Sequence, residues 1–232
     1  MKQAIVSAAF GVAYQELAEV TWPSQRAYAS RIGSEFITIE KRLFPGASGH
    51  WEKLQLRSFL DAYERVLWLD CDVIVRSDCP DLFLRVPAQA IGAWDESRSG
   101  PWDYRGIIVK WAGLAGLTDI SYPGWHFNSG VLVVSRCHAN LFDDPPGAFP
   151  GYELLWDQGW LNFGAARDRI AFAKMGKEFN HTFLSSGNRL NSHVIHYCGT
   201  LYGSGYAQDI LPGTRPADLI RLDLARWKAM GF

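Results

Sequence analysis

Short apolar runs recur along the chain, and most of them end at Gly or an acidic residue, which predicts buried β-strands. The runs cover residues 3–10, 66–69, 90–94, 127–134 and 193–197, and residues 35–40 alternate between β-branched and polar positions like a strand. Apolar residues between these runs recur at helical spacing. This spacing predicts helices over residues 51–62 and 153–163, a helix that begins near Pro23 and ends at Gly33, and an amphipathic helix within residues 215–232.

Strands that alternate with helical segments predict an α/β fold with a mainly parallel central sheet flanked by helices. We expect residues 1–232 to form one such domain, since no repeat or low-complexity stretch divides the chain. Loops are expected where Pro, Gly and polar residues cluster, over residues 44–49, 143–151 and 203–208. In sheets of this class ligands bind beyond the carboxyl ends of the strands, so polar residues there are the first candidates for a site.

Charge and composition argue against several classes of partner. The 232 residues carry 23 basic and 24 acidic side chains, a formal net charge of −1, with no long run of either sign. Nucleic acid is therefore not an expected partner, and no transmembrane segment is expected because no stretch of about 18 apolar residues occurs. The cysteines at positions 71, 79, 137 and 198 lack the spacing of a zinc site or disulfide framework, which favours a reducing, cytoplasmic location.

Two carboxylates directly follow the apolar run at 66–69, as Asp70 and Asp72 on either side of Cys71. Alternate side chains of a strand point the same way, so both carboxylates are expected on one side. Close carboxylates repel each other unless a cation lies between them, and oxygen ligands suit a hard divalent ion. A turn capped by aspartate explains the same pattern without a metal, and the pair alone does not decide between the two interpretations.

Three further segments place polar residues where apolar segments begin or are interrupted. Asn128 lies at the entry to an apolar run, where its amide suits a sugar hydroxyl or closes a loop-to-strand turn. Asp157 and Gln158 interrupt an apolar helical segment, so that they either cap the first turn of a helix or point into a pocket. His196 lies in the last apolar run, and its imidazole either is structural or completes a metal site begun by carboxylates, which would favour Mn²⁺ over Mg²⁺.

In their order and spacing these segments resemble the retaining glycosyltransferases of family eight, which include glycogenin and bacterial lipopolysaccharide galactosyltransferases. The resemblance rests on KLQLRSFLDAYERVLWLDCDVIV, FNSGVLVV, DQGWLN and VIHYCG, and it covers roughly residues 50–200. It implies a GT-A fold, a single Rossmann-like nucleotide-diphospho-sugar transferase domain. It also implies transfer of a hexose from a nucleotide sugar, usually a UDP-sugar, to a saccharide or other hydroxyl acceptor, with retention of the anomeric configuration.

The resemblance implies a role for particular residues of this chain. Asp70, Asp72 and His196 would bind Mn²⁺ or Mg²⁺, which bridges the diphosphate of the nucleotide-sugar donor. Lys53 would reach the donor, Ala8, Ala9 and Tyr14 would hold its base and ribose, and Asp95 would bind its sugar. Asn128, Asp157 and Gln158 would line the transferred sugar and the reaction centre.

The chain departs from the family pattern at two places. Family members usually follow the histidine with Gly-x-x-Lys-Pro-Trp, whose Lys contacts the diphosphate, whereas HYCGTLYGSGY here has neither Lys nor Trp. Lys174, Lys177 and Arg189 are candidate substitutes for that Lys. The first strand, with SAAFGVAY, also lacks the Asn or Asp that often lies near the base, which leaves the choice of nucleotide open.

Three other functions share part of this pattern. A non-catalytic or degenerate protein that binds sugar nucleotides or glycans would explain the missing Lys-Pro-Trp. An Asp-X-Asp phosphatase of the haloacid dehalogenase type also places two acids after an apolar strand, but on its first strand and with Thr or Ser close behind, whereas VIV follows here. A nucleotidyltransferase needs a basic, Gly-rich loop after its first strand, and GVAYQELAEV has no basic residue.

Overall fold

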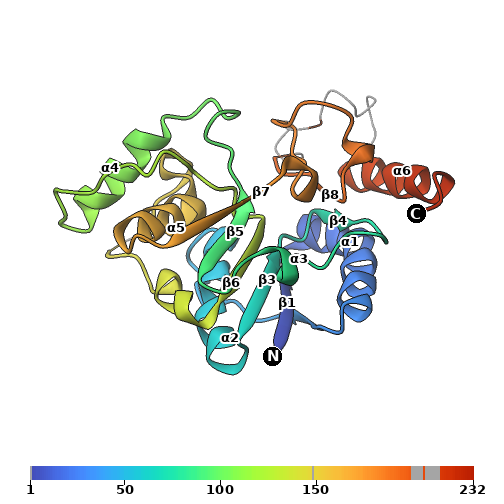
Figure 1. Ribbon diagram of the computed structural model, residues 1–232, viewed down its shortest axis with the longest axis horizontal. Coiled ribbons are helices and arrows are strands. Elements are labelled where there is room, and N and C mark those ends of the chain that lie inside the picture. Colours follow the sequence, from blue (N-terminus) through green and yellow to red (C-terminus); the bar gives the residue numbers. More distant parts are fainter. Residues whose placement is uncertain (1, 148, 200–205, 207–214) are drawn as a thin grey trace.

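The centre of the molecule is a six-stranded sheet with helices on both faces (Figure 1). The computed structural model describes residues 2–147, 149–199, 206 and 215–232. The strands, in spatial order, are β2 (Glu35–Ile39), β1 (Gln3–Ala8), β3 (Arg65–Leu69), β6 (Val131–Ser135), β5 (Ala90–Trp94) and β7 (Ala171–Met175). Within this sheet β6 runs antiparallel to its neighbours β3 and β5, and the other pairings are parallel. The predicted α/β class with a mainly parallel sheet is confirmed.

The alternation of side chains along the central strands divides the core into two layers. In β3, Val66 and Trp68 belong to the layer that contains α2 (Leu56–Ala62), α4 (Tyr104–Leu114) and α5 (Trp156–Arg167). Leu67 and Leu69 belong to the opposite layer, with α1 (Val12–Arg31) and α3 (Leu82–Arg85). The run at residues 66–69 is apolar at every position because both faces of this strand are buried.

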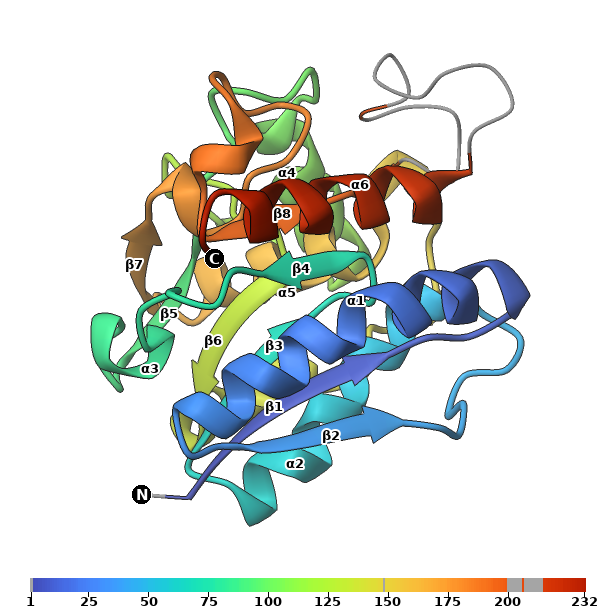
Figure 2. The same cartoon turned by 90° about the vertical axis from the view of Figure 1, so that its right-hand side faces the viewer.

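A second, two-stranded sheet lies beside the main one and is covered by the last helix. It pairs β4 (Val73–Val75) with β8 (Val194–His196) in antiparallel fashion. Ile74 and Ile195 of this sheet share an apolar cluster with Leu17 of α1 and with Ile220 of α6 (Pro216–Ala229). Figure 2 shows α6 in front of β8 and alongside β4, with β4 drawn between α6 and α1. The pairing of β4 with β8 thereby brings His196 next to the turn that follows β3.

Within the residues that the structure describes, short 3₁₀ helices connect the larger elements. They are η1 (Gly49–Gln55), η2 (Arg136–Phe142), η3 (Tyr152–Leu154), η4 (Lys177–Phe179) and η5 (Arg189–Asn191). The helices predicted over residues 51–62 and 153–163 therefore each begin with a 3₁₀ segment and become α-helical later.

Several predicted boundaries are wrong. The first helix begins at Val12 rather than near Pro23, which lies inside α1 on its exposed side, where water can bond the carbonyl that proline leaves unpaired. The strand predicted over residues 127–134 begins only at Val131. The predicted loop at 203–208 lies outside the described residues except for Tyr206.

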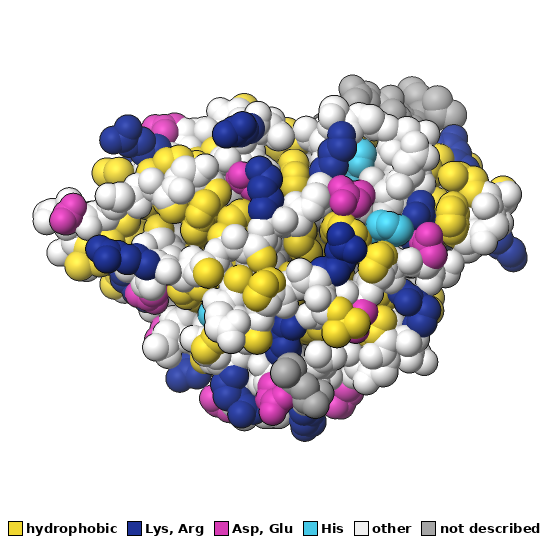
Figure 3. Space-filling view, in the orientation of Figure 1, with side chains coloured by type: hydrophobic (Ala, Val, Ile, Leu, Met, Phe, Trp, Pro, Cys, Tyr) yellow, Lys and Arg dark blue, Asp and Glu magenta, His cyan; other side chains and the backbone are white. Residues whose placement is uncertain are grey.

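Surface features of the described residues are mixed in character. None of their helices combines the length and the apolar character that a bilayer crossing needs. On the face drawn in Figure 3, basic and acidic side chains are interspersed with apolar ones and do not gather by sign. That face therefore shows no basic stripe of the kind that binds nucleic acid.

Candidate active site

Backbone pairing brings three segments to one edge of the main sheet, at the carboxyl ends of β3 and β5. The amide of Asp70, just after β3, donates to the carbonyl of Gly130 at 2.9 Å. The amide of Asn128 donates to the carbonyl of Trp94, the last residue of β5, also at 2.9 Å. The entry into β6 therefore lies between the ends of its two neighbours, at the edge where α/β sheets bind ligands.

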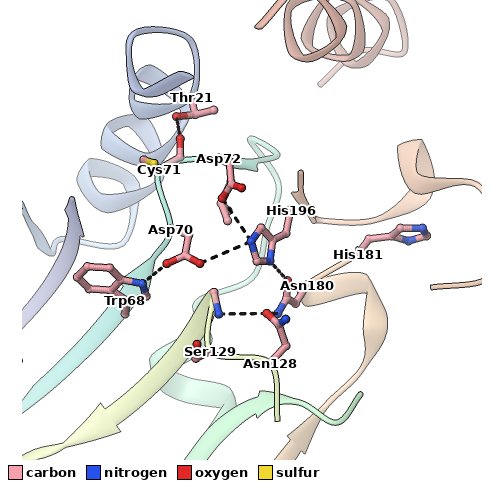
Figure 4. A network of polar contacts seen from close by, with 12 residues as sticks. Thr21, Trp68, Asp70, Cys71, Asp72, Asn128, Ser129, Asn180, His181 and His196 are labelled. Carbon is pink, nitrogen blue, oxygen red and sulfur yellow. Dashed lines mark hydrogen bonds and ion pairs between the residues drawn. The ribbon is translucent and has the colours of Figure 1, made fainter. Parts of the chain in front are cut away.

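Asp70 and Asp72 lie on the turn that joins β3 to β4, and not within a strand. The amide of Val73 donates to the carbonyl of Asp70 at 3.2 Å and closes this turn. The expectation that strand alternation aligns the two carboxylates is wrong in its reason, because the turn directs them. Both side chains nevertheless point toward His196 (Figure 4).

Polar side chains of α1 hold the backbone of this turn from behind. The Thr21 hydroxyl donates to the carbonyl of Cys71 at 2.6 Å. The Gln25 amide nitrogen donates to the carbonyls of Asp70 and Val73 at 3.0 and 2.9 Å. Sequence analysis did not identify Thr21 and Gln25, since neither lies in a motif, and both are fully buried.

His196 reaches the two carboxylates from the small sheet, where it pairs with Val73 across β4 and β8. Its Nε2 atom lies 3.6 Å from Asp70 Oδ2 and 3.3 Å from Asp72 Oδ1. Burial opposes the charged imidazole, but Asp72 and Asp70 outweigh it and hold the pKa of His196 above its ordinary value. Burial likewise disfavours the Asp70 carboxylate, yet Lys53 and His196 hold its pKa below the usual range.

The chemistry of these three side chains fits a divalent cation. One ligand atom from each of Asp70, Asp72 and His196 lies within 4.8 Å of the others, so small shifts of the side chains would bring all three atoms onto one ion. Two carboxylates and one imidazole are donors that Mn²⁺ accepts, and Mg²⁺ accepts the oxygens. The Trp68 indole N–H donates to Asp70 Oδ1, so its other oxygen, Oδ2, faces the imidazole.

Lys53 lies beneath the acids and joins them to α5. Its ammonium nitrogen is 2.9 Å from Asp157 Oδ2, 2.8 Å from Ser129 Oγ and 3.4 Å from Asp70 Oδ1, and the side chain is 3% exposed. Burial disfavours this charge, but Asp157 and Asp70 hold the pKa of Lys53 above its ordinary value. Lys53 thus balances two carboxylates inside the protein. Its expected contact with a donor stays a prediction.

Asp157 and Gln158 point into the molecule from the start of α5 and do not cap the helix. The Ser129 hydroxyl donates to Asp157 Oδ2 at 3.1 Å, and the Ser129 amide donates to Gln158 Oε1 at 3.1 Å. Two consecutive left-handed residues, Leu155 (φ 55°) and Trp156 (φ 44°), come directly before them. Such conformations cost about 1–3 kcal/mol each and often occur at functional sites.

Glu96 is a buried acid in the same network that sequence analysis missed. Its Oε1 accepts from the Gln158 amide at 2.6 Å and its Oε2 accepts from the Asn128 amide at 3.0 Å. Burial raises the pKa of Glu96. Asp95, the acid chosen from the sequence, instead accepts from Lys174 at 2.9 Å. The sequence offered one indication of Glu96, because it directly follows Asp95 at the end of the run IGAWDE.

The residues predicted to hold the base and ribose adjoin the Asp-X-Asp turn. Ala8 ends β1, and Ala9 packs in a small cluster with Ala18 and Cys71. Tyr14, at the start of α1, is partly buried against that cluster. A ligand bound there would therefore be next to the two acids.

The three basic residues proposed to replace the missing Lys are each bonded elsewhere. Lys174 pairs with Asp95, and Lys177 donates to the carbonyl of Ser186 at 2.7 Å. Arg189 pairs with the fully buried Asp223 at 2.6 Å. The described structure shows none of the three in contact with Asp70 or Asp72.

Several solved structures share this fold. One is a glycosyltransferase involved in the glycosylation of the major capsid of PBCV-1, which is 16% identical with a TM-score of 0.57 over 96% of this chain and 100% of that chain. An active-site mutant of LgtC is 18% identical (TM-score 0.52, 84% and 87% covered), and mouse xyloside xylosyltransferase 1 is 14% identical (TM-score 0.51, 86% and 99% covered). No family model and no curated protein sequence matches the chain. At these identities the likeness shows the GT-A fold alone.

Proposed function

We propose that the protein is a metal-dependent glycosyltransferase, which moves a sugar from a nucleotide-sugar donor to a hydroxyl acceptor. The observation that carries this proposal is the cluster of Asp70, Asp72 and His196 at the ligand-binding edge of a GT-A sheet. A cation held there would stabilise the negative charge that grows on a departing diphosphate. The glycosyltransferase structures with the same fold support the same class of reaction.

The proposed reaction exchanges one glycosidic bond for another. The bond between the anomeric carbon and the diphosphate oxygen breaks, and the acceptor oxygen bonds to that carbon from the same face. The acceptor proton passes to the diphosphate oxygen that leaves, so no strong protein base is required. This path retains the anomeric configuration, in keeping with the resemblance to family eight.

The protein's own side chains would orient the sugar and fix the surrounding charges. Asp157 is held by Lys53 and by the Ser129 hydroxyl, so we propose that it helps to position the transferred sugar and does not act as a nucleophile. Gln158 and Asn128 are held in place by Glu96. We propose a hexose, a UDP donor and Mn²⁺ or Mg²⁺ as the most consistent reactants, with Ala8, Ala9 and Tyr14 around the base.

The metal role is tested with Asp72→Asn, which keeps the size of the side chain and removes its charge. We expect Mn²⁺-dependent release of nucleoside diphosphate from nucleotide sugars by the wild type, and loss of at least about 100-fold in the variant because the Lewis acid is no longer held. EDTA should have the same effect on the wild type. The matched control is Asp61→Asn, an exposed aspartate on α2, which should keep full activity.

Turnover that survives both EDTA and Asp72→Asn would refute the metal role. Binding of nucleotide sugar without any turnover would instead favour a non-catalytic binding protein.

A further inference from the structure

A chain of buried polar side chains runs from Glu96, two residues after the end of β5, through two amides to the histidine of the proposed metal site. Asn128 donates to Glu96 Oε2, Asn180 Nδ2 donates to Asn128 Oδ1 at 2.9 Å, and Asn180 Oδ1 lies 3.0 Å from His196 Nδ1. Asn180 directly follows η4 and is fully buried, while Asn128 and His196 are nearly so. Figure 4 shows Asn180 between the imidazole and Asn128, on the side away from the acids.

The direction of every hydrogen bond in this chain follows from one backbone group. The amide of Gly130 can only donate, and it lies 3.0 Å from the side-chain end of Asn128 that also faces Asn180. That end of Asn128 is therefore its carbonyl oxygen. The end of Asn180 that meets it must then be the NH₂ group, which leaves the Asn180 oxygen to face His196.

An amide oxygen is an acceptor only, so the ring nitrogen beside it, Nδ1 of His196, must carry a hydrogen. A neutral imidazole has one N–H, so Nε2 is then the nitrogen with the free lone pair. Nε2 is the atom that faces Asp70 and Asp72. The opposite tautomer would direct an N–H at the position of the cation and leave Nδ1 against the Asn180 oxygen without a proton between them.

We propose that Asn180 is a positioning residue for the metal site, which holds His196 in the Nδ1–H tautomer so that Nε2 can bind the cation. This inference rests on the proposed function, since it supposes that His196 is a metal ligand. Outer partners of this kind commonly change metal affinity by about 10–100-fold when they are removed.

The first test needs no substitution. Long-range ¹H–¹⁵N spectra of the wild-type protein with ¹⁵N-labelled histidine, saturated with Zn²⁺ as a diamagnetic ion that imidazole binds, should show His196 protonated at Nδ1 and not at Nε2. A proton on Nε2 would overturn the inference while leaving the proposed transferase function intact.

The second test compares two variants in titrations with Mn²⁺ alone, followed by the electron paramagnetic resonance of free Mn²⁺. Asn180→Leu lacks the acceptor and should lose about 10–100-fold in Mn²⁺ affinity. Asn180→Asp keeps an acceptor for Nδ1–H but loses the donor to Asn128 Oδ1, so it should lose clearly less Mn²⁺ affinity than Asn180→Leu. Equal losses in both variants, or no loss in Asn180→Leu, would overturn the inference.

A matched control separates tautomer control from general disturbance of buried histidines. His181 Nδ1 lies 2.9 Å from the Ser192 hydroxyl, also in a buried setting close to β8. Ser192→Ala removes that partner and should leave Mn²⁺ affinity unchanged. If the wild type binds no Mn²⁺, both the inference and the metal role under the proposed function fail, which distinguishes that result from failure of the inference alone.

Discussion

The buried ammonium group of Lys53 forms ion pairs with the carboxylates of Asp157 and Asp70. Removing one partner of a buried ion pair leaves an uncompensated charge and costs about 3–5 kcal/mol. Because the Asp70 side chain is 28% exposed, we expect Lys53→Met to lower the free energy of unfolding by about 3 kcal/mol in urea titrations. The double variant with Asp157→Leu should recover part of this loss.

The surface pair of Arg57 with Asp61 provides the comparison for this prediction. Both side chains are exposed, so Arg57→Met should change the free energy of unfolding by less than about 1 kcal/mol. If Lys53→Met is no more costly than Arg57→Met, Lys53 does not stabilise the acids in the way described.

Gly130 leaves room for the imidazole of His196. A Cβ atom at this position would come within 2.1 Å of the His196 ring. We therefore expect Gly130→Ala to displace His196 and to weaken Mn²⁺ binding by at least about tenfold, on the scale seen when support around a metal ligand is lost. Calorimetric titration would measure this, with Gly113→Ala on α4 as the control, since nothing lies within 4 Å of a Cβ there. Unchanged Mn²⁺ affinity in Gly130→Ala would contradict the role assigned to His196.

At the scale of residues, the sequence identified those with a local signal. Asp70 and Asp72 follow an apolar run, and His196 lies in one, so the local pattern made them candidates, and the resemblance to family eight joined them into one predicted metal site. Glu96 and Asn180 matter through partners 32 and 52 positions from them, Asn128 in both cases. No local pattern encodes such contacts, so neither residue was selected, and Asp95 was selected from the family resemblance.

The ends of α1 and α5 show how similar backbone geometry can be built from different residues. After α1, Gly33 adopts φ 69°, and the amide of Ser34 donates back to the carbonyl of Ala29. After α5, Arg169 adopts φ 51°, and the amide of Ile170 donates to the carbonyl of Ala165 in the same six-residue arrangement. This left-handed position favours glycine, because other residues pay a steric penalty there.

We therefore expect Arg169→Gly to stabilise the protein by about 0.5–1 kcal/mol, after the entropy cost of glycine is subtracted from the relieved strain. For a chain of this length the melting temperature should rise by roughly 1–4 °C, measured by calorimetry. Arg169→Ala keeps the strain and should bring no gain. A gain from alanine as large as that from glycine would show that the left-handed conformation carries no penalty here.

At the scale of elements, the sequence predicted strands with continuous apolar runs well, but it did not predict elements that are exposed or interrupted by polar residues. The strands of the sheet centre were found because they are buried on both faces. β7 was missed because it is an edge strand in which Ala171 and Lys174 are exposed. The start of α1 was misplaced because Pro23 suits a first helical turn as well as the exposed interior position that it occupies.

The proposed metal site depends on packing between segments that are far apart in the sequence. His196 belongs to a two-stranded sheet that the sequence did not separate from the main one. A buried cluster fixes that sheet to the last helix, since Tyr197, next to His196, donates to Asp223 of α6 at 2.8 Å, and Arg189 pairs with the same carboxylate. Sequence spacing suggested that the acids and the histidine act together, but only the packing of α6 and α1 around the small sheet brings them into contact.

Donor binding should be visible as stabilisation of the whole molecule. A ligand at about 100 times its Kd stabilises the folded state by about 2.7 kcal/mol, which for a chain of this size corresponds to a rise of roughly 5–10 °C in melting temperature. We expect such a rise with a UDP-sugar and Mn²⁺ together, a smaller one with Mn²⁺ alone, and little with the UDP-sugar in EDTA.

Asp72→Asn provides the control for this ligand-induced stabilisation. It leaves the region around Ala9 and Tyr14 intact but removes one of the carboxylates that we propose to hold the cation, so its response to Mn²⁺ with UDP-sugar should shrink to that of the wild type in EDTA. The same measurement with sugars of other nucleotides identifies the preferred base, which the first strand leaves open because it lacks the Asn or Asp that often lies near the base. A rise that is equally large in EDTA would place the nucleotide away from Asp70 and Asp72, because a cation that bridges the diphosphate to these acids must couple the two ligands.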